Sequence, residues 1–170
     1  MSTHLILLAA GEGSRMLSDR AKVLHEIGSA PLFAHALKAA EEMADGRKVV
    51  VVGHDCASVA KAAKAIDPEI RIAEQTEQLG TAHAVLAAHE AMAGLEGDAL
   101  VLYGDTPFIR SETLIAMAEA RKNGADIVVL GFEATDPGRY GRLVTEGDTL
   151  LKIVEWKDAD EAERAISLCN

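Results

Sequence analysis

The sequence predicts a doubly wound α/β fold, in which helices cover both faces of a mostly parallel sheet. Short aliphatic and β-branched runs, typical of buried strands, alternate along the chain with longer segments whose apolar residues recur at helical spacing. Parallel strands need crossover connections, so this alternation indicates a parallel sheet. The hydrophobic fraction is 49% but aromatic residues make up only 4%, so we expect a mostly aliphatic core.

Local signals bound the expected elements. Pro31 lies where the first turn of a helix tolerates proline, Ser111 can cap a later helix, and Asn123-Gly124 is typical of a helix end. We expect strands at 5–8, 48–52, 70–73, 99–103 and 127–132, and helices at 31–43, 57–65, 81–92 and 111–122.

The pattern changes in the last third of the chain. Residues 143–154 are predicted to form two strands joined by a Gly147-Asp148 turn, which makes a hairpin. Asp158, followed three residues later by Glu161, resembles the capping box that starts a helix. Because 170 residues can bury one sizeable core, we expect a single domain over 1–170.

Charge and cysteine content narrow the class of protein. The formal net charge of −10 argues against nonspecific binding to nucleic acid or to an anionic membrane surface. Cys56 and Cys169 form no C-x-x-C pair, and no stretch has the pattern of a signal peptide or the length of a membrane span. We therefore expect a reduced, cytoplasmic protein that binds neither nucleic acid nor membrane.

The stretch after the first expected strand has the composition of a phosphate-binding loop. It contains Leu8, Ala9, Ala10, Gly11, Gly13, Arg15 and, further on, Lys22. Glycines let backbone N–H groups surround an anion, Arg15 can grip a phosphate with two N–H groups, and Lys22 adds a mobile charge. The stretch matches neither the P-loop nor the dinucleotide fingerprint, and glycine-rich turns also occur for packing alone. The two basic side chains favour a nucleoside triphosphate site.

Two further loops follow later strands. Gln75 carries a donor and an acceptor that suit the edge of a uracil, although its amide can turn to suit cytosine as well. Gly80 allows close approach to a flat base, and Thr81 can cap the next helix, as in any polar loop before a helix. Asp105 follows a buried strand, where a carboxylate often binds Mg²⁺, although Gly-Asp is also a common turn. Carboxyl ends of parallel strands share one edge, so we expect these loops to form one site.

These motifs resemble those of a known family. The strings L-A-A-G-x-G-S-R-M and K-V-L-H resemble the signature of nucleotide-sugar pyrophosphorylases. Q-x-x-Q-L-G-T-x-H-A resembles, more narrowly, the bacterial bifunctional N-acetylglucosamine-1-phosphate uridyltransferase/glucosamine-1-phosphate acetyltransferases. Ala21 stands before Lys22, where this family usually has proline. The resemblance covers nearly the whole chain and implies a Rossmann-like fold of the nucleotide-diphospho-sugar transferase type, with a β-hairpin subregion near the C-terminus.

The resemblance also implies residue roles. Arg15, Lys22 and Asp105 would be catalytic, with Asp105 as a ligand of the cofactor Mg²⁺. The nucleotide would contact Leu8, Ala9, Ala10, Gly11, Gly13, Lys22, Gln75, Gly80 and Thr81, with uracil held at Gln75 and Gly80. The sugar phosphate would contact Tyr103, Gly141, Glu155 and Asn170.

The implied reaction joins UTP to N-acetylglucosamine-1-phosphate and gives pyrophosphate and UDP-N-acetylglucosamine, a peptidoglycan precursor. The attacking phosphate is already anionic, so positioning and electrostatics would supply most of the catalysis. In the family a second Mg²⁺ ligand and a β-helix acetyltransferase domain, through which the enzyme trimerises, follow downstream. We therefore expect 1–170 to be an incomplete nucleotidyltransferase domain. A related nucleotidyltransferase with another base or sugar, and a noncatalytic nucleotide-binding protein, are the alternatives.

Overall fold

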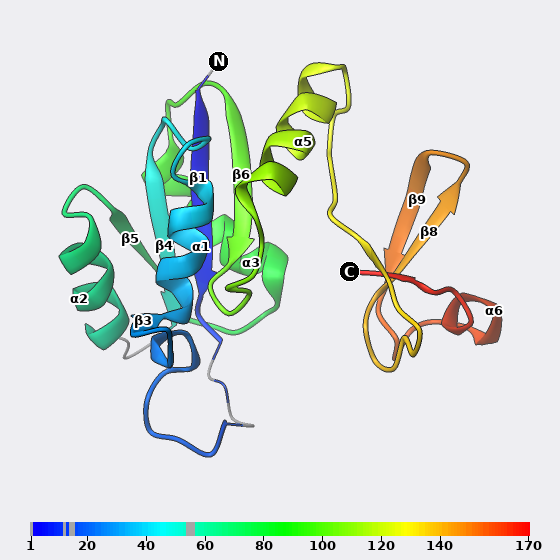
Figure 1. The fold of residues 1–170 in the computed structure, drawn as a ribbon, viewed down its shortest axis with the longest axis horizontal. Coiled ribbons are helices and arrows are strands. Elements are labelled where there is room, and N and C mark those ends of the chain that lie inside the picture. The colour runs from blue at the N-terminus through cyan, green and yellow to red at the C-terminus, as the bar shows by residue number, and fades with distance from the viewer. Residues whose placement is uncertain (1, 12, 14–15, 54–56) are drawn as a thin grey trace. The chain divides into compact units, whose positions relative to one another are not determined.

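The computed structural model describes residues 2–11, 13, 16–53 and 57–170 (Figure 1). The chain divides into two compact units, Met1–Ile115 and Ala116–Asn170. Each unit has its own sheet, and each is described by itself below.

The first unit is built on a four-stranded parallel sheet with the strand order β5-β4-β1-β6. Its strands are β1 (Thr3–Ala9), β4 (Lys48–Gly53), β5 (Arg71–Gln75) and β6 (Asp98–Tyr103). β1 lies inside the sheet, and its Leu5 and Leu7 are fully buried. The order places β6 on the opposite side of β1 from β4 and β5, so the winding direction reverses at β1. This confirms the predicted doubly wound parallel sheet.

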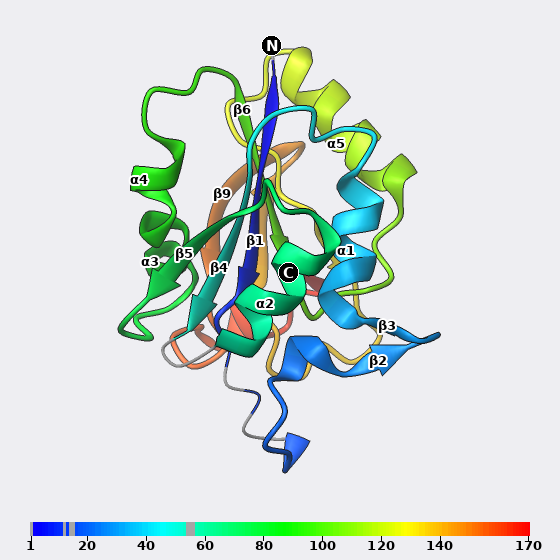
Figure 2. The same ribbon diagram turned by 90° about the vertical axis from the view of Figure 1, so that its left-hand side faces the viewer.

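Helices cover both faces of this sheet (Figures 1 and 2). One face carries α1 (Leu32–Ala40) and α2 (Ala57–Ile66), and the other carries α3 (Thr81–Ala87) and α4 (His89–Met92). The apolar stripe of α1 is buried, including Phe33 and Ala40 at 0% exposure, so the helix packs by the face that its sequence pattern predicts. On the opposite face, Ile6, Val49 and Ala84 belong to one buried cluster.

Short elements complete the first unit. The 3-10 helix η2 (Lys22–Leu24) leads to a small hairpin of β2 (Glu26–Ile27) and β3 (Ala30–Pro31). α5 (Ser111–Lys122) follows β6 and crosses the division between the units. Its Ser111 hydroxyl donates to the carbonyl of Ala39, which ties the start of α5 to the end of α1.

The predicted helix at 81–92 is interrupted, which the sequence pattern does not show. Ala88 lies between α3 and α4, and its N–H donates to the carbonyl of Val85, three residues back. An i to i−3 bond tightens the last turn into 3-10 geometry, which ends the α-helical ladder at that point. Ala88 itself is fully buried and belongs to the same cluster as Ile6, Val49 and Ala84.

The second unit has an antiparallel sheet in the order β7-β10-β8-β9. Its elements are β7 (Phe132–Glu133), β8 (Arg142–Glu146), β9 (Thr149–Val154), α6 (Glu161–Arg164) and β10 (Leu168–Cys169). β8 and β9 form the predicted hairpin, with Gly147 in the turn at a φ of 57°. The register shifts between Val144 and Thr145, as in a β-bulge.

Two predictions in this unit are wrong. A strand was expected at 127–132, but only Phe132–Glu133 pairs with a neighbour, and Ile127 is 80% exposed. An apolar run becomes a strand only where another strand offers its backbone, and no strand of this unit does so for residues 127–131.

The capping box lies two residues later than expected. Asp160 and Glu163 cap α6 reciprocally, through N···O distances of 2.8 and 2.9 Å. The N–H groups of Asp158 and Ala159 both donate to the carbonyl of Glu155, so the chain is still in the preceding turn at the predicted position.

Among the described residues, none of the helices is both long enough and apolar enough to span a membrane.

Candidate functional site

A cleft of about 260 Å³ opens beside the carboxyl ends of β1, β5 and β6. Figure 2 shows β1, β4 and β5 running toward the same edge of the sheet. The lining residues are Leu8, Ala10, Gly11, Lys22, Val23, Gln75, Gln78, Gly80, Thr81, Ala84, Tyr103 and Asp105. All three predicted loops therefore contribute to one cleft, as expected where a parallel sheet reverses its winding direction.

The loop after β1 borders the cleft through its backbone. Gly11 lines the cleft, and a Cβ added there would meet no atom of the described residues within 4 Å apart from its chain neighbours, so packing against those residues does not explain this glycine. Gly13 has a φ of +63°, and an added Cβ would lie 2.6 Å from the Cβ of Lys22, so this position does require glycine. Ala9 is buried in β1 and does not line the cleft. Arg15 lies outside the described residues.

Lys22 and Asp105 lie together although they are far apart in the sequence. Nζ of Lys22 donates to Oδ2 of Asp105 across 2.5 Å, and about a third of each side chain is exposed. Gly104 positions Asp105, because its N–H donates to the carbonyl of Leu8 at 2.8 Å. A Cβ on Gly104 would lie 3.1 Å from the oxygen of that carbonyl, a tight contact, so β6 approaches β1 closely at this glycine.

The amide of Gln75 has a defined orientation. Gln75 ends β5 and is only 4% exposed, and its Nε2 donates to the carbonyl of Gly80 at 3.2 Å. Nε2 also lies 3.1 Å from Nδ1 of His83, on the helix that follows. Gly80 has a φ of +96°, which glycine tolerates, and the loop turns there into α3 at Thr81. The amide that the sequence left free to turn is therefore held by two neighbours.

The sequence pattern did not indicate two polar residues of the site, His83 and Gln78, or two apolar lining residues, Val23 and Ala84. His83 contacts Gln75 as described, and Gln78 lines the cleft while its Nε2 donates to the carbonyl of Ala10 at 3.1 Å. Gln78 thereby links the loop after β5 to the loop after β1. Both polar residues belong to the Q-x-x-Q-L-G-T-x-H-A string, which was the one available signal, but their partners depend on the fold.

The second unit contains three of the residues predicted for the sugar phosphate and brings two of them, Gly141 and Asn170, into contact. The N–H of Asn170 donates to the carbonyl of Gly141 at 3.3 Å, and a Cβ on Gly141 would collide with the Asn170 side chain. That Cβ would also lie 3.7 Å from the carbonyl of Val154, the residue before the exposed Glu155. The fourth predicted residue, Tyr103, belongs to the first unit and lines the cleft.

Arg142 holds the loop that leads to Gly141. Its side chain is 2% exposed, and its guanidinium donates to the carbonyls of Pro137, Gly138 and Tyr140 and to that of Arg164, at the end of α6. A guanidinium has five N–H donors, so one side chain can satisfy several carbonyls at once. The loop is thus fixed from inside the unit.

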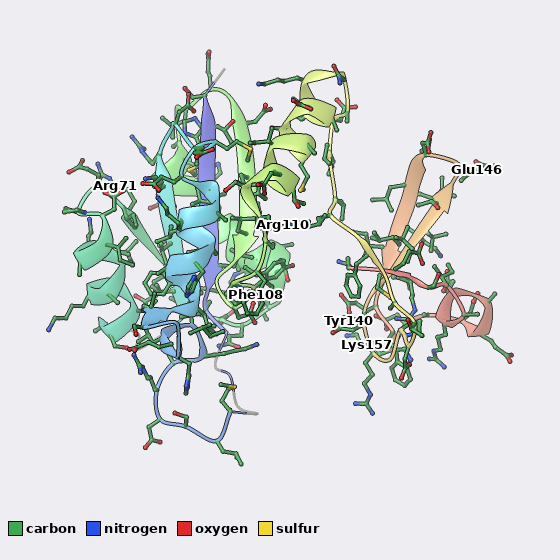
Figure 3. All side chains as sticks on the ribbon, viewed as in Figure 1. Arg71, Phe108, Arg110, Tyr140, Glu146 and Lys157 are labelled. Carbon is green, nitrogen blue, oxygen red and sulfur yellow. The ribbon has the colours of Figure 1, made fainter. Side chains whose placement is uncertain are left out.

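Aromatic contacts support the same loop. Tyr140, labelled in Figure 3 together with Lys157, packs edge-on against Phe132 with ring centroids 5.0 Å apart. The guanidinium of Arg139 lies 5.3 Å from the ring centroid of Trp156, and that of Arg164 lies 4.7 Å from it. These distances are within the range of cation–π attraction.

Comparison with known proteins identifies the family. A family model described as a MobA-like NTP transferase domain matches residues 5–166. The chain belongs to this family. The match includes both units and every predicted site residue except Asn170.

Curated relatives of this NTP transferase cover the whole chain. The protein named Bifunctional protein GlmU of Dinoroseobacter shibae is 60% identical over 170 residues, and its namesake in Cereibacter sphaeroides is 60% identical over 169. The chain covers 38% of the first protein's length and 37% of the second's. These matches confirm the resemblance to the bifunctional family that the motifs indicated.

Solved structures at lower identity share the fold of this NTP transferase. A putative glucose-1-phosphate thymidylyltransferase from Bacillus anthracis aligns with a TM-score of 0.78 at 19% identity, covering 99% of this chain and 68% of that one. A UDP-glucose pyrophosphorylase complexed with UDP-glucose aligns with a TM-score of 0.73 at 20% identity, covering 99% and 74%. They confirm the predicted fold class, the nucleotide-diphospho-sugar transferase type.

The donor set at the cleft fits a magnesium ion held partly by substrate. Within the described ranges, no group of three or more His, Cys, Asp or Glu side chains could hold a metal alone. Asp105 is the one carboxylate among the described lining residues. Magnesium is commonly bound through one or two carboxylates together with substrate phosphates, so a single aspartate beside the loop predicted to bind phosphate is compatible with it.

Proposed function

We propose that this NTP transferase joins UTP to N-acetylglucosamine-1-phosphate and releases pyrophosphate, with UDP-N-acetylglucosamine as the product. The observation that carries the proposal is the meeting of Lys22, Asp105 and the glycine loop in one cleft with Gln75 and Gly80. The whole-chain identity of 53–60% to proteins named GlmU supports it.

The reaction needs one bond to form and one to break. An oxygen of the sugar-1-phosphate attacks the α-phosphorus of UTP, and the bond from that phosphorus to the oxygen bridging to the β-phosphate breaks. Pyrophosphate leaves with the electron pair, and no proton has to be removed from the nucleophile. The obstacle is repulsion between polyanions, so the chain's contribution is to position them and to compensate charge.

The proposal assigns the phosphates and the metal to residues that follow β1 and β6. Lys22 compensates the charge on the phosphates that flank the reacting phosphorus, and Arg15 grips the departing β- and γ-phosphates. Backbone N–H groups near Gly11 and Gly13 approach the phosphates. Asp105 would hold Mg²⁺, which when bound neutralises phosphate charge and aligns the two substrates. These positive groups offset the chain's net charge of −10 beside the phosphates, which are the most anionic part of the ligand.

The remaining assignments concern the base and the sugar. Gln75 and Gly80 hold the uracil, with Leu8, Ala10 and Thr81 around the nucleotide, and Ala9, which does not line the cleft, takes no direct part. Gly141, Glu155 and Asn170 of the second unit are assigned to the sugar phosphate. On this proposal the two units are parts of one incomplete nucleotidyltransferase domain in a cytoplasmic enzyme. The relatives are longer than this chain. The same proposal gives the whole enzyme an acetyltransferase domain through which it trimerises.

Pyrophosphate release tests the function directly. The assay uses UTP and N-acetylglucosamine-1-phosphate with the 170-residue chain and with an extended chain, in which the downstream sequence of the Dinoroseobacter shibae protein follows Asn170. We expect Mg²⁺-dependent release, faster in the extended chain. Faster release with dTTP, CTP or GTP would reassign the base. Tight UTP binding by the extended chain without any release would instead establish a noncatalytic nucleotide-binding protein.

A further inference from the structure

The neighbours of the Gln75 amide determine which of its two ends is nitrogen. A backbone carbonyl can only accept a hydrogen bond, so the end 3.2 Å from the oxygen of Gly80 must be Nε2. With the amide turned over, Oε1 would face the Gly80 oxygen, and two acceptors would repel each other. The carbonyl therefore selects one orientation of the amide.

His83 takes the second hydrogen of the same nitrogen. Its Nδ1 lies 3.1 Å from Nε2 of Gln75, and since an amide nitrogen only donates, Nδ1 must be the acceptor. This requires the tautomer of His83 that carries its proton on Nε2. Both hydrogens of the Gln75 amide are then engaged by the protein, and they are engaged at a side chain that is only 4% exposed.

Oε1 is what remains for a ligand. Gln75 lines the cleft, and all its side-chain hydrogen bonds to the described residues run through Nε2. The side chain thus offers the cleft a fixed acceptor and no donor. A freely turning amide would offer either.

We propose that His83 is a positioning residue that sets base selectivity by fixing the Gln75 amide with Oε1 toward the ligand. The proposal rests on the nucleotidyltransferase function proposed above. A fixed acceptor favours bases whose pairing edge carries a ring N–H. Uracil has this group at N3, whereas cytosine has an unprotonated N3 there and would face Oε1 with a second acceptor. The selected ligand class is therefore nucleoside triphosphates whose base carries a ring N–H on its pairing edge, which includes uracil and excludes cytosine.

The experiment compares UTP and CTP in competitive titrations on the 170-residue chain and three variants. We expect His83→Leu to lower the preference for UTP over CTP about tenfold, because one buried hydrogen of Gln75 loses its acceptor and the Gly80 carbonyl alone then opposes the turned amide. His83→Asn should keep most of the preference, since its amide oxygen can take the place of Nδ1. His89→Leu, on the exposed start of α4, is the matched control and should leave the preference unchanged.

The pattern of effects separates selectivity from general stability. A purely structural histidine would weaken UTP and CTP binding equally in His83→Leu, and that result would overturn the proposal. Should His83→Leu not fold, NMR of the wild-type chain still decides. Both Gln75 side-chain protons should be protected from exchange with solvent, and rapid exchange of either would contradict the double hydrogen bond.

The same titration distinguishes this inference from the proposed function. Wild-type chain that binds CTP as tightly as UTP would count against the uridylyl assignment itself. A wild-type preference for UTP that survives intact in His83→Leu would count against His83 alone. In the extended chain, the selectivity change should appear in KM for the nucleotide, with kcat for UTP changed much less.

Discussion

The ammonium of Lys22 lies 2.5 Å from a carboxylate oxygen of Asp105, although 83 residues separate them in the sequence. The pair joins the start of η2 to the loop after β6, at the edge of the cleft. Our proposal gives these groups different partners during catalysis, with phosphate for Lys22 and Mg²⁺ for Asp105. When substrate and metal bind, Lys22 and Asp105 must then release each other. The ion pair therefore competes with the binding of phosphate and Mg²⁺.

The first prediction follows from this competition. Replacing Lys22 by Met frees Asp105 from its cation, so Mn²⁺, as a paramagnetic substitute for Mg²⁺, should bind more tightly when nucleotide is absent. An exposed ion pair contributes about 0.2–1 kcal/mol, which corresponds to an increase of up to roughly fivefold in affinity. Electron paramagnetic resonance titration of free Mn²⁺ measures it. Lys38→Met, which removes an exposed lysine paired with Glu41, is the control. Equal Mn²⁺ affinity in wild type and Lys22→Met would refute the competition.

The second prediction concerns Asp105 during turnover. Asp105→Asn keeps the shape of the side chain but removes the charge proposed to hold the metal. We expect turnover of the extended chain to fall roughly 10²-fold or more, as when one electrostatic stabiliser is removed from an active site. Asp148→Asn, in the exposed hairpin turn of the second unit, should have normal turnover. Near-normal Mg²⁺-dependent release of pyrophosphate from Asp105→Asn would exclude the ligand role.

Much of the fold could be predicted because local patterns and tertiary structure agree. β1 and β4 are aliphatic runs that are buried on both faces of the sheet, as continuous apolar strands are in parallel sheets. The segment 127–131, where the predicted strand is absent, is also apolar. Its local sequence does not indicate whether a partner strand lies beside it. Two overlapping D-x-x-E strings exist at 158–161 and 160–163, and the turn at Glu155 decides which one caps α6.

The site was predictable to the level of loops and not to the level of contacts. The rule that strand ends share an edge brought Lys22, Gln75 and Asp105 into one expected site, and they do line one cleft. This rule places the loops at one edge of the sheet but does not predict the positions of their side chains. The ion pair of Lys22 and the double hydrogen bond of Gln75 depend on rotamers and on backbone positions set by distant residues, so the roles of His83 and Gln78 were missed.

The third prediction tests the guanidinium that holds the loop before Gly141. Arg142→Met would remove the donor from the carbonyls of Pro137, Gly138, Tyr140 and Arg164, and each hydrogen bond to a charged group is worth about 1.5–3 kcal/mol. We expect the second unit to unfold at lower denaturant concentration, and KM for the sugar phosphate to rise in the extended chain. KM for UTP should change little, because the nucleotide is assigned to the first unit. Arg142→Lys, with fewer donors, should be intermediate. A rise of both KM values together would point to general disorder instead.

The fourth prediction is a pH dependence of stability. The Lys48 ammonium, 3.1 Å away, and then the N–H of Glu69 hold the pKa of Asp67 below its ordinary value of 3.8. A lowered pKa means that the folded state favours the ionised carboxylate. The resulting stabilisation is complete above the unfolded pKa and is lost as the pH falls through the folded one. Asp67→Asn should lower the free energy of unfolding at pH 7 by about 0.2–1 kcal/mol, and the difference should vanish in strong acid. Urea titrations at both pH values measure it, and a difference that persists in acid would contradict the assignment.

The fifth prediction compares Gly11 and Gly13, for which the structure gives different physical reasons why the residue is glycine. Gly13 has a positive φ and lies against Lys22, so Gly13→Ala should destabilise the chain by about 1–2 kcal/mol, the cost of a left-handed conformation, and should displace Lys22. Gly11 lines the cleft with open space where a Cβ would project, so Gly11→Ala should melt at the wild-type temperature.

The contrast between these two variants locates the nucleotide. If its phosphates approach the backbone at Gly11, the added methyl group stands between them and the N–H groups, and UTP binding should weaken roughly tenfold or more, about 1.4 kcal/mol. Thermal melts and UTP titrations of both variants separate the effects, because Gly11→Ala should lose binding without losing stability. Wild-type UTP affinity in a fully folded Gly11→Ala would mean that the phosphates do not approach this loop, and the proposed roles of Gly11 and Gly13 would have to be abandoned.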